Sequence, residues 1–267
     1  MASPPAPPVL ATFRDVFRYR ALVQNLVLKD LKLKYRNSLL GVVWSLLNPL
    51  LTLAVYTFAF HMILRVQMED YPSFLLVSLL PWNFFSSALV ASTGSILQSG
   101  HLIRKVNFPR EVLPISTVLF WFAQLLLAFA VFLPCLMATS ALRARWTFVL
   151  SIPLLFLHLV FTTGLALVLS AVTTSFRDVA HLTEVALLLL FWLTPIAYPV
   201  TMAPVWLQPW LRASPLSAFA IAYQEVLFAR RVPDGLVLAS VLVFPVLSLF
   251  LGLAVFRKYS PSLAERV

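Results

Sequence analysis

Residues 236–256 read LVLASVLVFPVLSLFLGLAVF, a run of 21 residues without a single Asp, Glu, Lys or Arg. A helix needs about 20 mainly apolar residues to cross the hydrocarbon core of a bilayer, so this run predicts a membrane-spanning helix. Five further apolar stretches precede it. The sequence therefore predicts an all-α integral membrane protein with six transmembrane helices, at about residues 38–64, 73–97, 113–139, 147–173, 182–200 and 236–256.

The composition of the chain agrees with a membrane location. Hydrophobic residues make up 61% of the chain and charged residues 11%, and the mean hydropathy is +0.91. A soluble domain of this length needs a larger charged fraction to stay in solution. The net charge of +10 does not indicate a nucleic-acid surface, because the basic residues flank the apolar spans. Anionic membrane lipids are the expected partners of these charges.

The distribution of Lys and Arg predicts the orientation of the chain. Six spans place both termini on one side of the membrane, and that side carries 14 Lys and Arg residues against six on the other. Cytoplasmic segments carry the excess of positive charge, so both termini are expected in the cytoplasm. Residues 257–267 then form a short cytoplasmic tail. The Pro-rich residues 1–11 are expected to be disordered and to contain no cleaved signal peptide.

Residues 12–37 are expected to form an amphipathic helix in the cytoplasmic interface. At about 100° per residue, its apolar face contains Phe13, Val16, Phe17, Val23, Val27, Leu31 and Tyr35. The opposite face is basic, and its charges suit either a positive-inside anchor or the binding of anionic headgroups, two roles that are compatible. The four candidates for binding an anionic headgroup are Lys29, Lys32, Lys34 and Arg36.

Residues 201–234, between the fifth and sixth predicted spans, are too long for a turn and too apolar for a solvated loop. Their aromatic residues are interrupted by Pro204, Pro209 and Pro215. We expect short helices that re-enter the outer half of the membrane, where protein or a water-filled cavity satisfies their backbone groups. A seventh and an eighth span are the alternative, which the short lengths of the pieces disfavour.

The sequence contains no catalytic constellation. None of the six glycines opens a P-loop, and the four histidines lack the spacing of metal ligands. The ten carboxylates lie almost wholly outside the predicted spans, which disfavours acid–base catalysis and proton-coupled transport. His158 is expected to bond a neighbouring helix, Glu184 to be interfacial, and Glu225 to pair with Arg230 or Arg231. We expect no enzyme activity, no metal site and no cofactor in this chain.

Four motifs carry a resemblance to a known family. The loop after the second span reads LIRKVNFPREVLP at residues 102–114, and that span contains LPWNFF at residues 80–85. KLKYRNSLLGVVW stands at residues 32–44 and WLTPIAYP at residues 192–199. Together these motifs make the chain similar to the type 2 ABC transporter permeases that export polysaccharides, which include exporters of O-antigen, capsule and teichoic acid.

The resemblance implies a homodimer in the bacterial inner membrane with two copies of a separate P-loop ATPase, which would hold ATP and Mg. It also implies that a short helix within the loop at residues 98–112 couples to the ATPase. A basic loop ended by Pro109 and Pro114 agrees with a rigid element that faces another protein, although its cations would also enforce topology. The coupling candidates are His101, Leu102, Arg104, Lys105, Asn107, Phe108 and Arg110.

The resemblance further implies a permease subunit of an ATP-driven exporter that moves a lipid-linked polysaccharide, similar to O-antigen, to the outer side of the inner membrane. Aromatic faces stack on sugar rings without reading their linkages. The candidates for lining such a channel are Tyr56, Phe58, Phe60, Trp82, Phe84, Phe85, Trp121 and Phe122. A permease for a drug or a small lipid, a membrane-embedded glycosyltransferase and a passive channel are the alternatives.

Overall fold

The computed structural model describes residues 18–36, 43–63, 65, 68–106, 108–138 and 146–260. Within these ranges the chain is helical and contains no strand, which confirms the all-α prediction. Several predicted features lie outside the described residues. These are residues 1–11, the first part of the predicted interface helix at 12–17, the residues 37–42, the coupling candidate Asn107 and the end of the tail at 261–267.

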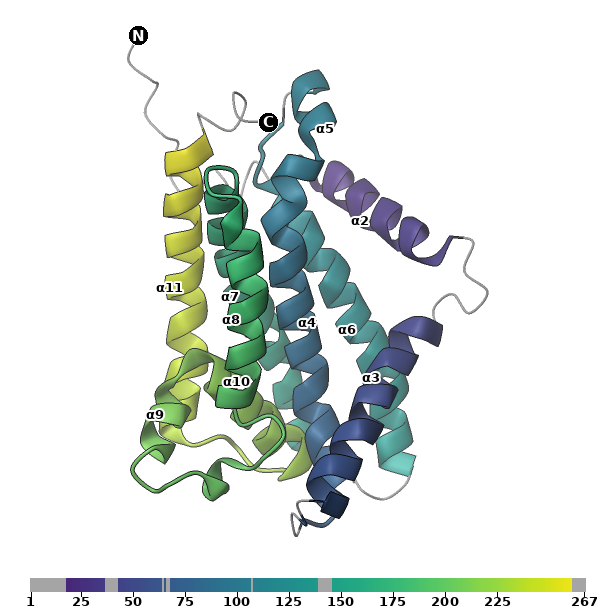
Figure 1. Ribbon diagram of the computed structural model, residues 1–267, viewed down its shortest axis with the longest axis vertical. Coiled ribbons are helices and arrows are strands. Elements are labelled where there is room, and N and C mark those ends of the chain that lie inside the picture. The colour runs from purple at the N-terminus through teal and green to yellow at the C-terminus, as the bar shows by residue number, and fades with distance from the viewer. Residues whose placement is uncertain are drawn as a thin grey trace.

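Within the described ranges, four helices are long and apolar enough to cross a membrane, and they correspond to four of the six predicted spans. They lie side by side along the long axis of the molecule (Figure 1). The four helices are α4 (Tyr71–Gln98), α6 (Val112–Ala138), α7 (Ser151–Thr173), which follows the 3-10 turn η2 (Trp146–Leu150), and α11 (Gly235–Tyr259).

The other two predicted spans correspond to shorter helices. α3 (Val43–Tyr56) continues as the π-helix η1 (Thr57–Ile63), and α8 (Asp178–Leu193) has 16 residues, a length of about 24 Å. α8 therefore ends seven residues before the predicted end of the fifth span at residue 200. The reason is local, because Thr194 precedes Pro195 and takes an extended conformation with ψ 135°, as residues before proline prefer.

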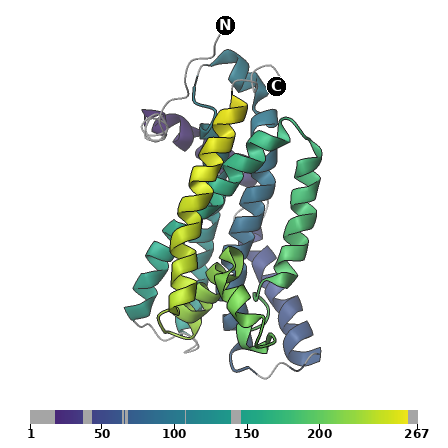
Figure 2. The same ribbon diagram turned by 90° about the vertical axis from the view of Figure 1, so that its left-hand side faces the viewer.

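The short helices gather at the two ends of the bundle (Figures 1 and 2). α2 (Arg20–Tyr35) and α5 (Gly100–Lys105) lie at the upper end in Figure 1, where α11 also ends. The region 201–234 forms short helices at and above the lower end, as its prolines predicted. These helices are η3 (Val200–Met202), α9 (Gln208–Ala213), α10 (Pro215–Tyr223) and the π-helix η4 (Gln224–Phe228).

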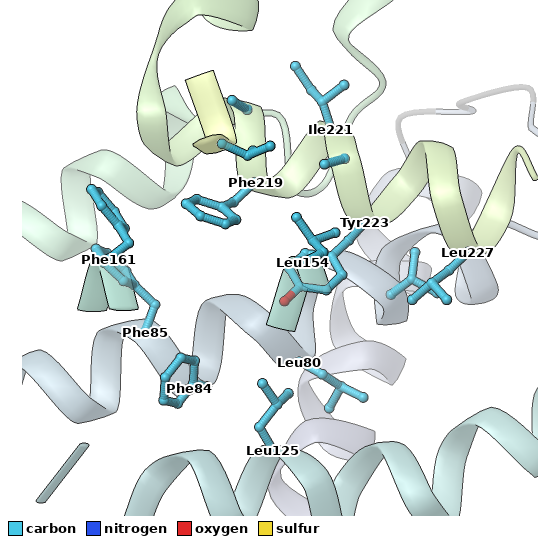
Figure 3. Packing of buried hydrophobic residues seen from close by; sticks show 14 of the residues in the cluster. Leu80, Phe84, Phe85, Leu125, Leu154, Phe161, Phe219, Ile221, Tyr223 and Leu227 are labelled. Carbon is cyan, nitrogen blue, oxygen red and sulfur yellow. The ribbon is translucent and has the colours of Figure 1, made fainter. Parts of the chain in front are cut away.

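The main core lies where α10 packs against α4 and α7. Figure 3 shows Phe84 and Phe85 of α4 with Phe161 of α7 and Phe219 of α10, and each of these four side chains is almost completely buried. His158 of α7 lies among them, with its ring stacked on Phe219 at a centroid distance of 4.4 Å. Its Nδ1 lies 3.5 Å from the hydroxyl of Tyr223 on α10, so the contact of His158 with a neighbouring helix is confirmed.

A second core joins α2 to the bundle. Val23 of α2 is buried in it together with Ile96, Phe108 and Phe256. The described members of the predicted apolar face, such as Val27, turn toward the bundle, whereas Leu28 and Leu33 remain 51% and 60% exposed. The apolar face of α2 therefore packs at least in part on protein.

Candidate functional site

A polar cavity of about 520 Å³ lies between the end of α2 and the middle of α3, α4 and α6. We refer to it as the polar cavity. Its size lies within the range of ligand sites in proteins, about 300–1,000 Å³. The lining residues are Lys34 from α2; Asn48, Pro49 and Thr52 from α3; Leu80, Asn83, Phe84 and Ser87 from α4; and Trp121, Gln124, Leu125 and Ala128 from α6.

Helical spacing produces this lining. Residues four apart lie above one another on one face of an α-helix. Asn83 and Ser87 therefore project from the same face of α4, and Trp121 and Leu125 from the same face of α6. Amide and hydroxyl groups thus converge in an open cavity between otherwise apolar helices. This arrangement suits a ligand that carries several hydrogen-bonding groups.

Lys34 lines the polar cavity from the end of α2. Its ammonium group donates to Gln124 Oε1 at 3.3 Å and lies 4.8 Å from the centroid of the Trp121 ring. The hydroxyl of Tyr35 donates to the same Gln124 oxygen at 2.6 Å, so Gln124 anchors the end of α2 to α6. Although residue Lys34 stays exposed overall, partial desolvation lowers the pKa of its ammonium group. A cation beside an indole face suits an anionic group attached to a sugar.

The structure separates the four headgroup candidates. Only Lys34 lines the polar cavity. Lys29 forms an exposed ion pair with Asp30 at 3.4 Å, and Lys32 and Arg36 are exposed on other sides of α2. Exposed cations still attract anionic lipids through long-range fields, but they lie outside the cavity lining.

The predicted channel aromatics lie in different parts of the structure. Trp121 and Phe84 line the polar cavity, and Phe122 packs edge-on against Phe84 at 5.6 Å. Phe85 is 2% exposed and stacks on Phe161 in the core. Phe58 of η1 is 57% exposed.

The remaining three channel candidates belong to a second group of rings, which we call the aromatic cluster. It joins α3 and η1 to α8 and α4. The Tyr56 ring stacks on Phe191 at 5.4 Å, and the Phe60 ring stacks on Trp192 at 6.3 Å. Its members are Tyr56, Phe60, Tyr71, Trp82, Phe191 and Trp192.

The coupling candidates divide into outward and inward residues. α5 projects from the upper end of the molecule in Figure 1, and His101, Arg104 and Lys105 are exposed on it. Leu102 faces the second core, in which Phe108 is 7% exposed. The guanidinium of Arg110 donates to the backbone oxygen of Ser260 at the end of α11. The outward residues form a basic surface on a short helix.

Comparison with known proteins assigns the family. The family model of the ABC-2 type transporter matches residues 21–228, which include α2, the polar cavity and the short helices after α8. The chain belongs to the ABC-2 type transporter family. It is a multi-pass membrane protein and a transport subunit, and its family implies that it works with an ATPase subunit.

The ABC-2 permease has curated relatives along almost its whole length. It is 31% identical to "O-antigen export system permease protein RfbA" of Myxococcus xanthus over 95% of this chain and 98% of that protein. It is 30% identical to a protein of the same name from Klebsiella pneumoniae, over 89% and 91% of the two chains. "Polysialic acid transport protein KpsM" of Escherichia coli is 26% identical over 89% and 93%.

Sequence reasoning missed the polar wall of the cavity. Gln124, Asn83 and Ser87 were not among its candidates, although the four-residue spacing of Asn83 and Ser87 within an apolar helix was a visible signal. The pairing of Glu225 was predicted correctly, because Arg231 donates to its Oε1 at 2.6 Å. Among the described residues, no group of three or more His, Cys, Asp or Glu is arranged to hold a metal ion.

Proposed function

We propose that this ABC-2 permease exports a lipid-linked polysaccharide, similar to O-antigen, from the cytoplasmic to the outer side of the bacterial inner membrane. The observation that carries the proposal is the polar cavity, in which the Lys34 ammonium lies beside the Trp121 ring and the Gln124 amide. The names of the relatives, which are O-antigen export and polysialic acid transport proteins, support the substrate class.

The chemistry of the cavity matches the junction between a lipid carrier and a glycan. The anionic group of the carrier binds Lys34, since a charge-assisted contact in a partly desolvated site is stronger than one in water. The first sugar then packs on the indole face of Trp121, and its hydroxyls bond the amides of Asn83 and Gln124. The exposed Lys29, Lys32 and Arg36 raise the local concentration of anionic lipid near the cavity.

The working unit in this proposal is a homodimer with two ATPase subunits that bind ATP and Mg. α5 docks on the ATPase through His101, Arg104 and Lys105, an assignment that their exposure supports. The six-span topology with cytoplasmic termini follows if α3 with η1, and α8 with residues 194–199, each complete a crossing. In that topology α2 lies at the cytoplasmic interface, and α9 and α10 re-enter from the outer side.

Reconstitution of the permease with its ATPase in proteoliposomes tests the function. ATP turnover and accumulation of glycan in the lumen are measured with lipid-linked glycan, carrier lipid alone, free glycan, and a panel of small lipids and drugs. The proposal expects ATP-dependent movement of the lipid-linked glycan only. Stimulation by a small lipid or drug without glycan movement supports the rival permease, and glycan synthesis from a sugar donor supports the glycosyltransferase.

Two pairs of variants connect that activity to the polar cavity. Lys34→Gln removes the cation, and the expected loss of glycan export is about tenfold, as for a lost charge-assisted hydrogen bond. Lys258→Gln, at an exposed position near the end of α11, is its control. Trp121→Leu is expected to lower export by about threefold to tenfold, whereas Trp210→Leu, with a side chain 72% exposed on α9, is not. Equal export by all four variants would refute the assignment of the cavity.

A further inference from the structure

The chain leaves the helical conformation in the middle of a buried region. After α8 ends at Leu193, residues 194–199 are unwound, with Thr194 2%, Ile196 0% and Ala197 3% exposed. We call them the unwound segment. An unwound backbone inside a membrane protein is tolerated only where other groups pair with its carbonyl and amide groups, because an unpaired buried group is costly.

Three side chains from two other elements pair with the unwound segment. The Gln224 amide donates to Pro195 O at 2.8 Å, and the Tyr71 hydroxyl donates to Ala197 O at 2.7 Å. The Ser78 hydroxyl is 3.1 Å from Ile196 O and shares its one proton between this oxygen and Leu75 O of its own helix, at 3.2 Å. The Gln224 amide also lies 3.3 Å from Ser78 Oγ. Three successive carbonyls are therefore held by side chains, which we call the clasp.

The clasp residues are themselves fixed in place. Tyr71 and Ser78 are seven residues apart, two turns along the same face of α4, and are 0% and 1% exposed. Gln224 begins the π-helix η4 and is 6% exposed. Side chains that are buried in this way have little freedom to turn elsewhere, so the unwound segment has one well-defined position.

The clasp also connects to the aromatic cluster. The Tyr71 ring stacks on Phe60 at 6.3 Å, and Phe60 stacks on Trp192 at the end of α8. Tyr71 thus has two contacts near the end of α8: its hydroxyl bonds the backbone of the unwound segment, and its ring stacks on Phe60. Loss of the clasp would free the end of α8, and with it the ring of Trp192, to move relative to α3.

We propose that Tyr71, Ser78 and Gln224 are positioning residues for transport, which hold the end of α8 so that the exposed Trp192 ring of the aromatic cluster is presented to the passing substrate. This inference rests on the proposed function and adds to it a place for Trp192 beside the path of the glycan. It assigns a role to Gln224, which belongs to the region between α8 and α11. No residue of that region lines the polar cavity.

Three substitutions remove the donors one at a time. Ser78→Ala removes the side-chain donor to Ile196 O, and Gln224→Leu removes the donor to Pro195 O. Tyr71→Phe removes the donor to Ala197 O but keeps the ring. Ser170→Ala is the matched control, because Ser170 is 0% exposed and its hydroxyl bonds only Leu167 O of its own helix. Ser78→Thr keeps a hydroxyl at the same position and is the rescue variant.

The assay measures substrate moved per ATP hydrolysed by the complex in proteoliposomes, together with amide hydrogen exchange at residues 196–198. Each of the three clasp variants is expected to exchange faster there and to move about tenfold less substrate per ATP. The amount of assembled complex and its basal ATP turnover should stay unchanged, since α5 and the second core are untouched. Ser170→Ala and Ser78→Thr should behave as the wild type.

The two proposals fail in different ways. If the wild type moves a compound other than lipid-linked glycan, the proposed function is wrong, and the ratio of that compound to ATP tests the clasp. Faster exchange with normal transport per ATP would show that the clasp is only structural and would overturn the inference. Unchanged exchange in all three variants would show that the hydrogen bonds do not hold the segment, which would also overturn it.

Discussion

The close contact between the two long helices α7 and α11 is expected to be intolerant of a single methyl group. α7 and α11 meet backbone to backbone at Gly164 and Gly252. A Cβ at Gly252 would lie 2.3 Å from Gly164 O, and a Cβ at Gly164 would lie 2.3 Å from the backbone carbon of Ser248. Helix pairs in membranes use small residues at such contacts to gain close packing.

The cost of Gly252→Ala follows from the geometry. Ordinary van der Waals contact begins at 3.4 Å, so the helices must separate locally by 1.1 Å, the difference between that distance and 2.3 Å. Overpacking of this kind costs about 2 kcal/mol. The bond from the Ser248 hydroxyl to Phe161 O, 3.2 Å long, would be stretched too far, at a cost of about 1 kcal/mol. Alanine regains about 1 kcal/mol as a better helix former, which leaves a net destabilisation of about 2 kcal/mol.

Reversible unfolding in mixed detergent and SDS micelles, followed by circular dichroism, measures the change. Gly235→Ala is the control, because a Cβ there meets no atom within 4 Å, and it should be neutral or slightly stabilising. Gly164→Ala should destabilise like Gly252→Ala. The double variant should cost less than the sum, since one separation of the helices accommodates both methyl groups. Equal stability of Gly252→Ala and Gly235→Ala would refute the close-packing argument.

Three further predictions concern charges. Burial lowers the pKa of Lys34 from its ordinary 10.5, so its charge is lost at a lower pH than usual and substrate-stimulated ATP turnover should fall as the pH rises. Lys34→Arg should keep this turnover up to a higher pH, because arginine stays charged. The same loss of turnover with rising pH in both proteins would contradict this. Arg231→Ala removes the nearest cation of the Glu225 carboxylate, whose side chain is 6% exposed, and leaves it with Arg212 at 4.0 Å; since Arg231 itself is largely exposed, the change should destabilise by about 1 kcal/mol in the same unfolding assay. Adding Glu225→Gln should recover part of that loss, and no recovery would show that the pair does not act through charge. Replacement of the exposed Arg104 and Lys105 by Ala should weaken binding of the ATPase by about tenfold without loss of permease stability, and an unchanged dissociation constant would remove them from the interface.

The contacts of several predicted site residues depend on how each helix is rotated in the bundle, and one sequence does not specify that rotation. Lys34 and Trp121 are far apart in the chain, and they meet because α2 packs across α6 through Gln124. Phe84 and Phe85 are neighbours, yet only Phe84 reaches the polar cavity, because successive residues on a helix point about 100° apart. The same spacing turns Leu102 toward the second core while Arg104 is exposed.

The sequence by itself determined the features that depend on local composition. Long apolar runs predicted helices that satisfy their own backbone groups in a membrane, prolines predicted the short helices after residue 200, and four motifs pointed to the family. The tertiary structure alone decided what those helices do to one another. Helix packing brings Lys34, Trp121 and the amide side chains of Asn83 and Gln124 together around one cavity, and it places Gln224 beside the unwound segment after α8. The physical reason is that burial and hydrogen bonding between distant segments depend on the rotation and depth of each helix, which packing sets and hydropathy does not.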